Sequence, residues 1–277
     1  MSPATAKQPR VRLDHLLVER GLVDTRTRAQ ALVLAGKVRV GDGDSARRDR
    51  KPGDLLDPAT PVTLVEREPY VSRGGHKLAA ALDAFAIDPG GRTCLDVGAS
   101  TGGFTDVLLQ RGARRVYALD VGRGQLAEPL RRDERVVSLE KTNARTLTAT
   151  SLPEPVSLIT IDVSFISLGL VLGPAASCLE PRGGELVALV KPQFEAGRNA
   201  VERGVVRRPE VHAEVLRRVA ETSAGLGLGT RGVIASPIRG PQGNREFLAY
   251  LGPGPSCAEL HRVIDAAVDA AWADERS

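Results

Sequence analysis

The chain has 277 residues, of which 42% are hydrophobic and 26% are charged, as is usual for a globular protein with one sizeable domain and a smaller one. It contains no apolar run long enough to span a bilayer, and its polar, basic N-terminus lacks the pattern of a signal peptide. Three scattered cysteines and four scattered histidines exclude a disulfide framework and give no metal-ligand spacing. We therefore expect a cytoplasmic protein without a metal site.

Positive charge is concentrated near the N-terminus. Residues 1–65 hold 12 Lys and Arg against 8 Asp and Glu, so they account for the whole formal net charge of +4. A basic segment beside a neutral one indicates an anionic partner, such as a nucleic acid, for the basic part. An ordinary solvated surface is the alternative, because a net charge of +4 is small.

The first 65 residues are predicted to form a small α+β domain. Leucines at helical spacing predict a first helix, and Thr25 is a suitable N-cap for a second one. A glycine follows each helix and ends it. Strands are expected at Val38–Val40 and Val62–Val65.

Basic side chains remain on the polar faces of these elements, where they can meet the phosphates of an RNA without reading its sequence. The chain resembles the RNA-binding domain of the ribosomal-protein-S-four type in two segments, Arg12-Leu-Asp-x-x-Leu-Val-x-Arg-Gly-Leu22 and Thr25-Arg-x-x-Ala-x-x-Leu-Val-x-x-Gly-Lys-Val38. This resemblance covers about residues 10–65 and implies RNA binding through the second helix and the loop after it. A purely structural or protein-binding module is the alternative. The expected RNA contacts are Arg12, Arg26, Arg28, Lys37 and Arg39, with Arg73 beyond this domain.

A domain boundary is predicted next. The segment Glu66–Gly75 is polar and contains a proline, so we expect a first domain over residues 1–65, a linker over 66–74 and a second domain over 75–277. A helix from about His76 to Phe85 opens the second domain.

The segment Thr93–Phe104 is predicted to form a buried strand, a glycine-rich turn and the start of a helix. Its glycines let the backbone turn sharply and approach a ligand, and Asp96 places a carboxylate at the strand end, where ligands bind in open parallel sheets. The pattern is Gly-x-x-x-Gly-Gly and not Gly-x-Gly-x-x-Gly, which favours S-adenosylmethionine over a dinucleotide. A tight strand-to-helix turn without a ligand is the alternative for this segment alone.

Strands and helices alternate through the second domain, which predicts a parallel sheet with helices on both faces. The last two strands are separated by too few residues for a helical crossover, so the final strand is expected to run antiparallel. A seven-stranded, Rossmann-like α/β sheet with one reversed strand is the fold of S-adenosylmethionine-dependent methyltransferases. The predicted strands are Thr93–Val97, Val116–Asp120, Val136–Leu139, Leu158–Asp162, Glu185–Val190, Gly232–Ile238 and Glu246–Leu251.

Polar side chains follow these strands. Asp120 ends the second strand, where an acid can accept both ribose hydroxyls of an adenosine, and Asn143 follows the third, where it can bind the adenine edge. Asp162 and Lys191 end the fourth and fifth, so an acidic and a basic group face one crevice. Each of these residues taken singly has an alternative interpretation. Asp120 can be the N-cap of a nearby helix, and Asp162 and Lys191 can form a surface ion pair. The expected cofactor-binding residues are Asp96, Gly98, Ser100, Thr101, Gly102, Gly103, Phe104, Asp120, Val121, Asn143 and Asp162.

The chain resembles the TlyA family in five motifs: Ser72-Arg-Gly-Gly-His-Lys77, Asp96-Val-Gly-Ala-Ser-Thr-Gly-Gly-Phe-Thr105, Asp162-Val-Ser-Phe-Ile-Ser167, Leu189-Val-Lys-Pro-Gln-Phe-Glu195 and Asn244-Arg-Glu-Phe247. Members of this family are rRNA 2′-O-methyltransferases with an FtsJ-like catalytic domain, and some are labelled haemolysins. The resemblance covers nearly the whole chain and implies methylation of cytidine ribose in 16S and/or 23S rRNA, within ribosomal subunits or their precursors. It also implies a catalytic set of Lys77, Asp162, Lys191 and Glu246.

Other classes of function stay open at this point. A non-catalytic RNA-binding or ribosome-assembly factor can retain the same fold, although the complete set of four residues argues against it. A membrane-lytic haemolysin is the second alternative, and the lack of a signal or spanning segment argues against it. Cys94 and Cys178 stand in apolar settings, so we interpret them as core residues and not as nucleophiles.

Overall fold

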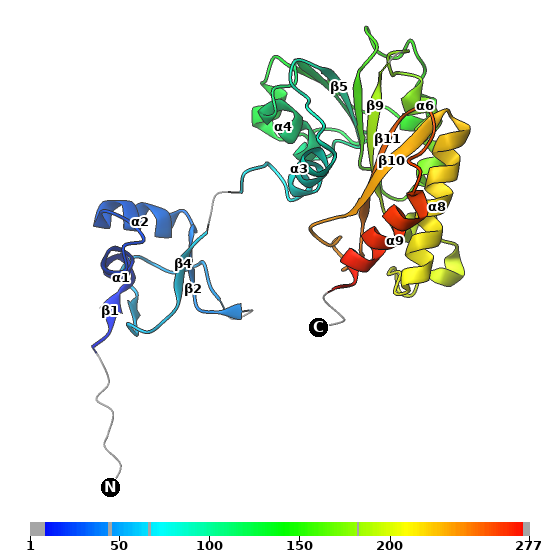
Figure 1. Ribbon diagram of the computed structural model, residues 1–277. Helices are drawn as coiled ribbons and strands as arrows, with labels where there is room; N and C mark the ends of the chain where they lie inside the picture. Colours follow the sequence, from blue (N-terminus) through cyan, green and yellow to red (C-terminus); the bar gives the residue numbers. More distant parts are fainter. Residues whose placement is uncertain (1–8, 44–45, 66–67, 182, 274–277) are drawn as a thin grey trace. The chain divides into compact units, whose positions relative to one another are not determined.

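The computed structural model describes residues 9–43, 46–65, 68–181 and 183–273. The expected absence of a signal peptide concerns residues 1–8, which lie outside this range, as do residues 66–67 of the expected linker. The chain divides into two compact units, Met1–Pro69 and Tyr70–Ser277 (Figure 1). This boundary falls inside the expected linker, because the residues after Pro69 contact the second unit: the Val71 N–H donates to the Asp106 carboxylate at 2.8 Å.

The small unit contains the two helices and the following strand that its sequence predicts, together with two short strands, Val11–Arg12 and Leu55–Leu56, that were not predicted. Thr25 caps the second helix, since its hydroxyl accepts a hydrogen bond from the Arg28 N–H at 3.2 Å. The strands form two antiparallel pairs, β1 with β3 and β2 with β4. The elements are β1 (Val11–Arg12), α1 (Leu13–Glu19), α2 (Arg26–Leu34), β2 (Val38–Val40), β3 (Leu55–Leu56) and β4 (Val62–Leu64).

The second unit is built on a seven-stranded sheet with the order β10-β11-β9-β8-β5-β6-β7. All neighbours are parallel except β11, which is antiparallel to both β9 and β10, so the predicted reversed strand is confirmed. The strands are β5 (Thr93–Val97), β6 (Arg115–Leu119), β7 (Val136–Leu139), β8 (Leu158–Ile161), β9 (Glu185–Val190), β10 (Leu228–Ala235) and β11 (Phe247–Pro253).

The predicted bounds of the sixth strand, Gly232–Ile238, were wrong at both ends. β10 begins at Leu228, because its pairing with β11 continues past an irregularity between Thr230 and Gly232. It ends at Ala235, the last residue that pairs with β11; after it the Ser236 hydroxyl donates to the Ile238 carbonyl oxygen at 2.7 Å.

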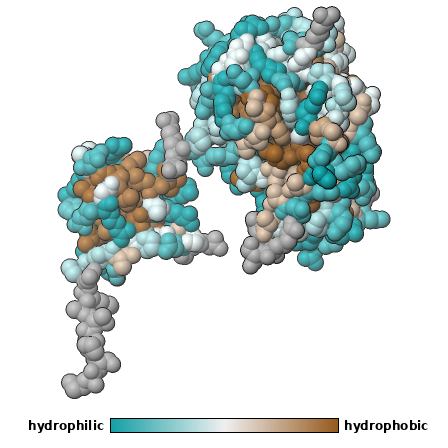
Figure 2. All heavy atoms as spheres, viewed as in Figure 1, coloured by the Kyte–Doolittle hydropathy of each residue, from teal (hydrophilic) through white to brown (hydrophobic). Residues whose placement is uncertain are grey.

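Helices cover both faces of the sheet, with one hydrophobic core on each side (Figure 1). One core includes side chains of α3 and α4, and the other includes side chains of α6, α8 and α9. Figure 2 shows hydrophilic side chains over much of the outer surface. Within the described residues, no helix has the length and apolar character needed to cross a membrane. The α-helices are α3 (Gly74–Phe85), α4 (Gly103–Gln110), α5 (Glu128–Arg131), α6 (Leu172–Ala176), α7 (Pro192–Glu195), α8 (Pro209–Gly225) and α9 (Leu260–Ala271), and the 3-10 helices are η2 (Ala144–Thr146), η3 (Leu168–Leu170) and η4 (Arg198–Ala200).

The topology brings polar residues to one edge of this sheet. Asp120, Asp162 and Lys191 come directly after the parallel strands β6, β8 and β9. Glu246 precedes β11, whose first residue pairs with the last residue of β9 because the two strands run in opposite directions. The start of β11 therefore lies at the same edge as the carboxyl ends of its neighbours.

Candidate active site

Two adjoining cavities open at this edge of the sheet. The first has a volume of about 350 Å³ and the second about 360 Å³. They share four lining residues, Gly98, Ser100, Asp162 and Ser164. The first cavity contains all four residues of the expected catalytic set, while Asp120 and Asn143 line the second.

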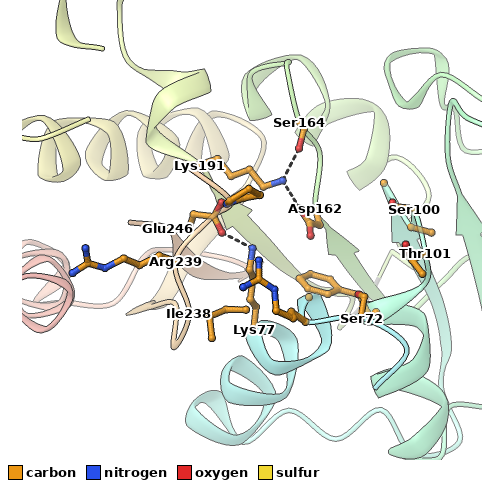
Figure 3. Close-up of a pocket in the computed structure, with 17 residues that line it drawn as sticks. Ser72, Lys77, Ser100, Thr101, Asp162, Ser164, Lys191, Ile238, Arg239 and Glu246 are labelled. Atoms are coloured by element: carbon orange, nitrogen blue, oxygen red, sulfur yellow. Dashed lines mark hydrogen bonds and ion pairs between the residues drawn. The ribbon is translucent and has the colours of Figure 1, made fainter. Parts of the chain in front are cut away.

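The catalytic set forms two lysine–carboxylate pairs in the first cavity (Figure 3). The Lys191 ammonium lies 2.5 Å from Asp162 Oδ1 and donates to the Ser164 hydroxyl at 2.7 Å. The Lys77 ammonium donates to Glu246 Oε2 at 2.5 Å. The lysine side chains are 10% and 11% exposed and the Glu246 side chain 1%, so these charges interact in a largely water-excluded space where they are worth more than at a surface.

Small residues make room for the buried pair. Lys77 lies in the first turn of α3, and Glu246 reaches it from the residue before β11. A Cβ atom on Gly240 would lie 2.7 Å from Glu246 Oε1, so a larger residue there would displace the carboxylate.

The turn after β5 forms the floor shared by the two cavities. Gly98 has a φ of +86°, and a Cβ on it would lie 2.9 Å from the Asp162 carbonyl carbon and closer still to its oxygen. A Cβ on Gly103 would lie 2.9 Å from the Gly75 nitrogen and would also overlap the Ser72 hydroxyl. Thr101 and Phe104 line the first cavity beside this turn.

Asp96 and Gly102, two expected cofactor contacts, line neither of these cavities. Asp96 is fully buried, and its carboxylate accepts hydrogen bonds from the Thr105 and Thr160 hydroxyls at 2.7 and 3.0 Å. Burial raises the pKa of Asp96 to about 6 despite these hydrogen bonds. Gly102 has a φ of +97°, and a Cβ on it would meet the Leu126 side chain at 2.7 Å. Both residues therefore support the turn from the side away from the cavities.

The second cavity contains the other expected cofactor contacts. Asp120 accepts hydrogen bonds from the Ser100 N–H at 2.8 Å and the Gly122 N–H at 2.7 Å, which fix its carboxylate. Asn143 caps η2 by accepting from the Arg145 N–H at 3.1 Å. Val121 is 69% exposed and also lines this cavity.

Several lining residues were not expected from the sequence. Ser164 and Phe165 stand inside the quoted motif after the fourth strand, so the motif itself was the signal for them. Phe165 is 90% exposed with a φ of +64°, and an exposed aromatic ring at a cavity is suited to stacking on a nucleobase. Ser72 lies in the motif before Lys77. Arg239 belongs to the loop between β10 and β11, where no sequence pattern marked a cavity.

Comparisons with known proteins agree with this geometry. Residues 70–253 match the family model of the FtsJ-like methyltransferase, and residues 11–42 match that of the S4 domain. A Mycobacterium tuberculosis protein named 16S/23S rRNA (cytidine-2'-O)-methyltransferase TlyA is 49% identical, over 87% of this chain and 90% of that protein. The chain belongs to the TlyA family. YqxC of Bacillus subtilis is 48% identical, over 90% of this chain and 89% of the YqxC chain. A solved Streptococcus thermophilus structure named as a hemolysin has a TM-score of 0.74 and 43% identity, over 97% and 98% of the two chains.

The S4 domain of this TlyA-family protein holds its arginines in two different ways. Arg12 and Arg26 converge on the fully buried Asp14, each with its Nε 3.0 Å from a carboxylate oxygen, and Gln30 donates to the same carboxylate at 2.9 Å. The Arg12 guanidinium and the other donors hold the pKa of Asp14 well below its usual range.

The other expected RNA contacts of the TlyA-family chain do not join this network. Arg28 pairs with Asp24 at 3.2 Å, and Arg39 donates to the Gly43 carbonyl oxygen at 2.8 Å. Lys37 is half-buried just before β2. Arg73 is exposed and lines the first cavity of the second unit, so it belongs to the catalytic domain.

Proposed function

We propose that this protein transfers a methyl group from S-adenosylmethionine to the ribose 2′-hydroxyl of cytidine in 16S and/or 23S rRNA. The observation that carries the proposal is the pair of lysine–carboxylate contacts inside one cavity at the carboxyl edge of a methyltransferase sheet. The name of the M. tuberculosis relative supports the choice of substrate. We place the protein in the cytoplasm, acting on ribosomal subunits or their precursors.

The residues present fit S-adenosylmethionine. We assign Asp120 to the ribose hydroxyls and Asn143 to the adenine edge; the two backbone N–H groups that fix Asp120, and the position of both residues on the second cavity, support this assignment. The missing Cβ of Gly98 lets the backbone approach the ligand, while Ser100, Thr101, Gly103 and Phe104 would surround its methionine part. When bound, the cofactor supplies a methyl group on a positively charged sulfur, and transfer neutralises that charge.

The protein's own groups must position the ribose and accept a proton, because a 2′-hydroxyl is a poor nucleophile. Lys191 is the residue that we assign as proton acceptor: its ammonium first releases a proton to solvent as the complex closes, and the neutral amine, held by Asp162 and Ser164, then takes the hydroxyl proton. The Lys77–Glu246 pair lines the same cavity, and we assign the Lys77 ammonium to stabilise the negative charge that develops on the ribose oxygen as its proton leaves.

RNA recognition is assigned to the S4 domain within residues 1–65; of the expected linker 66–74, the residues from Tyr70 on belong to the catalytic unit, which continues through the expected domain 75–277. Arg12 and Arg26 are held at fixed positions by Asp14 while their side chains stay 43% and 50% exposed, which suits them for phosphate contacts. Arg28, Lys37 and Arg39 add positive charge on the same domain, and Arg73 does so at the cavity.

The experiment that tests this proposal is transfer of labelled methyl groups to purified small and large ribosomal subunits, followed by nuclease mapping. Label recovered as 2′-O-methylcytidine supports the proposal and identifies the subunit. Bound cofactor without transfer to subunits or to naked rRNA would favour the non-catalytic assembly factor. Leakage of liposomes caused by the pure protein would favour the haemolysin.

A further inference from the structure

The segment between α7 and α8 carries three arginines that the proposed mechanism does not use. Arg203, Arg207 and Arg208 are all exposed. None of them is ion-paired with a residue in the part of the chain that the structure describes. Over residues 197–210 the sequence contains four arginines and two glutamates, so the segment carries a net positive charge.

Arg203 stands at the tip of a tight and defined turn. Glu202 and Val205 exchange two backbone hydrogen bonds, both 2.9 Å long. Between them Arg203 has a φ of +49° and Gly204 a φ of +82°, as two-residue type I′ turns require. A left-handed arginine persists only where its surroundings hold the backbone in place, so this side chain projects from a fixed support.

A buried asparagine ties this turn to the catalytic cavity. Asn244 is 1% exposed; its side-chain oxygen accepts from the Val206 N–H at 3.1 Å, and its side-chain nitrogen donates to the Gly204 carbonyl oxygen at 2.8 Å. Asn244 is two residues before Glu246, and its own carbonyl oxygen accepts from the Gly240 N–H at 2.9 Å. The turn and the catalytic glutamate are therefore fixed to one short segment of backbone.

At its N-terminal end the same segment is joined to α7, which directly follows Lys191. In Figure 1 the chain before α8 lies at the edge of the sheet where β10 and β11 are joined. Arg208 lines a hollow of about 450 Å³ that also contains Ala196 and the ion pair of Arg218 with Glu214. Ala196 follows Lys191 by five residues. The three arginines therefore stand on a segment that follows Lys191 in the chain and is tied through Asn244 to the backbone that carries Glu246.

We propose that Arg203, Arg207 and Arg208 form a second RNA-binding surface, located on the catalytic domain, which binds phosphates flanking the target nucleotide. This inference rests on the proposed function, because it takes rRNA as the substrate. A cavity of about 350 Å³ holds one nucleotide's reacting part, so the rest of a polyanionic chain must cross the surrounding surface. Arginines that have no acidic partner among the described residues are suited to bind its phosphates.

The test compares Arg203→Gln/Arg207→Gln/Arg208→Gln with a control that loses the same number of charges on the same domain, Arg111→Gln/Arg217→Gln/Arg262→Gln. Both are full-length proteins, and unchanged S-adenosylmethionine affinity shows that each is folded. The dissociation constant for an rRNA fragment is measured over a series of salt concentrations. We expect the salt slope of the first variant to fall by about 0.7 for each lost phosphate contact, with a higher KM for RNA and an unchanged kcat.

A salt slope and KM equal to those of the control would overturn this proposal. Loss of methylation on assembled subunits with full methylation of naked rRNA would also overturn it, because the arginines would then bind a ribosomal protein. If the wild-type protein does not methylate rRNA, the proposed function is wrong. If the wild type is active and the triple variant is equally active, only the second RNA-binding surface is wrong.

Discussion

Replacing Gly98 by alanine should impair both the stability of the protein and the geometry of the catalytic cavity. The φ of +86° costs a non-glycine residue about 1–2 kcal/mol. The new Cβ would also lie 2.9 Å from the Asp162 carbonyl carbon, where 3.4 Å is the start of ordinary contact, so Asp162 must shift. Because misplacing a reacting group by about 1 Å costs on the order of 100-fold in rate, we expect kcat to fall 10- to 100-fold, in addition to about 2 kcal/mol of stability.

The matched control is Gly227→Ala, which has a φ of +78° but no atom within 4 Å of the added Cβ. It should lose a similar 1–2 kcal/mol of backbone energy and keep the wild-type kcat. Urea denaturation gives the free energy of unfolding, and steady-state methyl transfer to rRNA gives kcat. A Gly98→Ala enzyme that turns over like the Gly227→Ala control would refute the reasoning, because contact with Asp162 would then have no consequence.

Two further predictions concern buried carboxylates. Asp14→Asn should destabilise the S4 domain by about 2 kcal/mol at neutral pH, because hydrogen bonds to a charged group are weakened, and should weaken rRNA binding, since Arg12 and Arg26 lose their anchor; equal rRNA affinity in the two proteins would contradict this. Because the folded pKa of Asp14 lies below its ordinary value, its contribution is present above about pH 4 and lost on acidification below it. The pH dependence that Asp96 contributes has the opposite sign. Its pKa in the folded protein is about 6, above the usual 3.8. Raising the pH from 4 to 6 should therefore lower the free energy of unfolding by up to about 3 kcal/mol, because the unfolded chain loses this proton first. Urea titrations across that range should show the decline in the wild type and not in Asp96→Asn.

Much of this site could be predicted because strand ends are visible in the sequence. Hydrophobic runs followed by Asp120, Asp162 and Lys191 identify the carboxyl edge of a parallel sheet, and the short gap before the last strand predicts its reversal. The structure contains that reversal. It also brings the four expected catalytic residues to one cavity.

The parts that sequence reasoning missed depend on contacts between distant segments. Asp96 was expected to face the cofactor, but its hydrogen bonds to Thr105 and Thr160 direct it beneath the turn. Asn244 was noticed only as part of a motif, and its role follows from backbone groups 38 and 40 residues away. Asp14 was quoted only as part of the first motif, since no local pattern shows that two arginines and a glutamine converge on it.

The central claim is that Lys191 accepts the proton of the ribose hydroxyl in a cavity that also binds S-adenosylmethionine. The most direct measurement is single-turnover methyl transfer to rRNA by Lys191→Ala, with calorimetric binding of S-adenosylmethionine to the same preparation. We expect transfer to fall by 10²- to 10⁴-fold, as loss of a positioned proton acceptor does, while cofactor affinity stays near the wild-type value. A variant that transfers methyl groups at the wild-type rate, or one whose loss of rate is matched by its loss of cofactor affinity, would contradict the assignment.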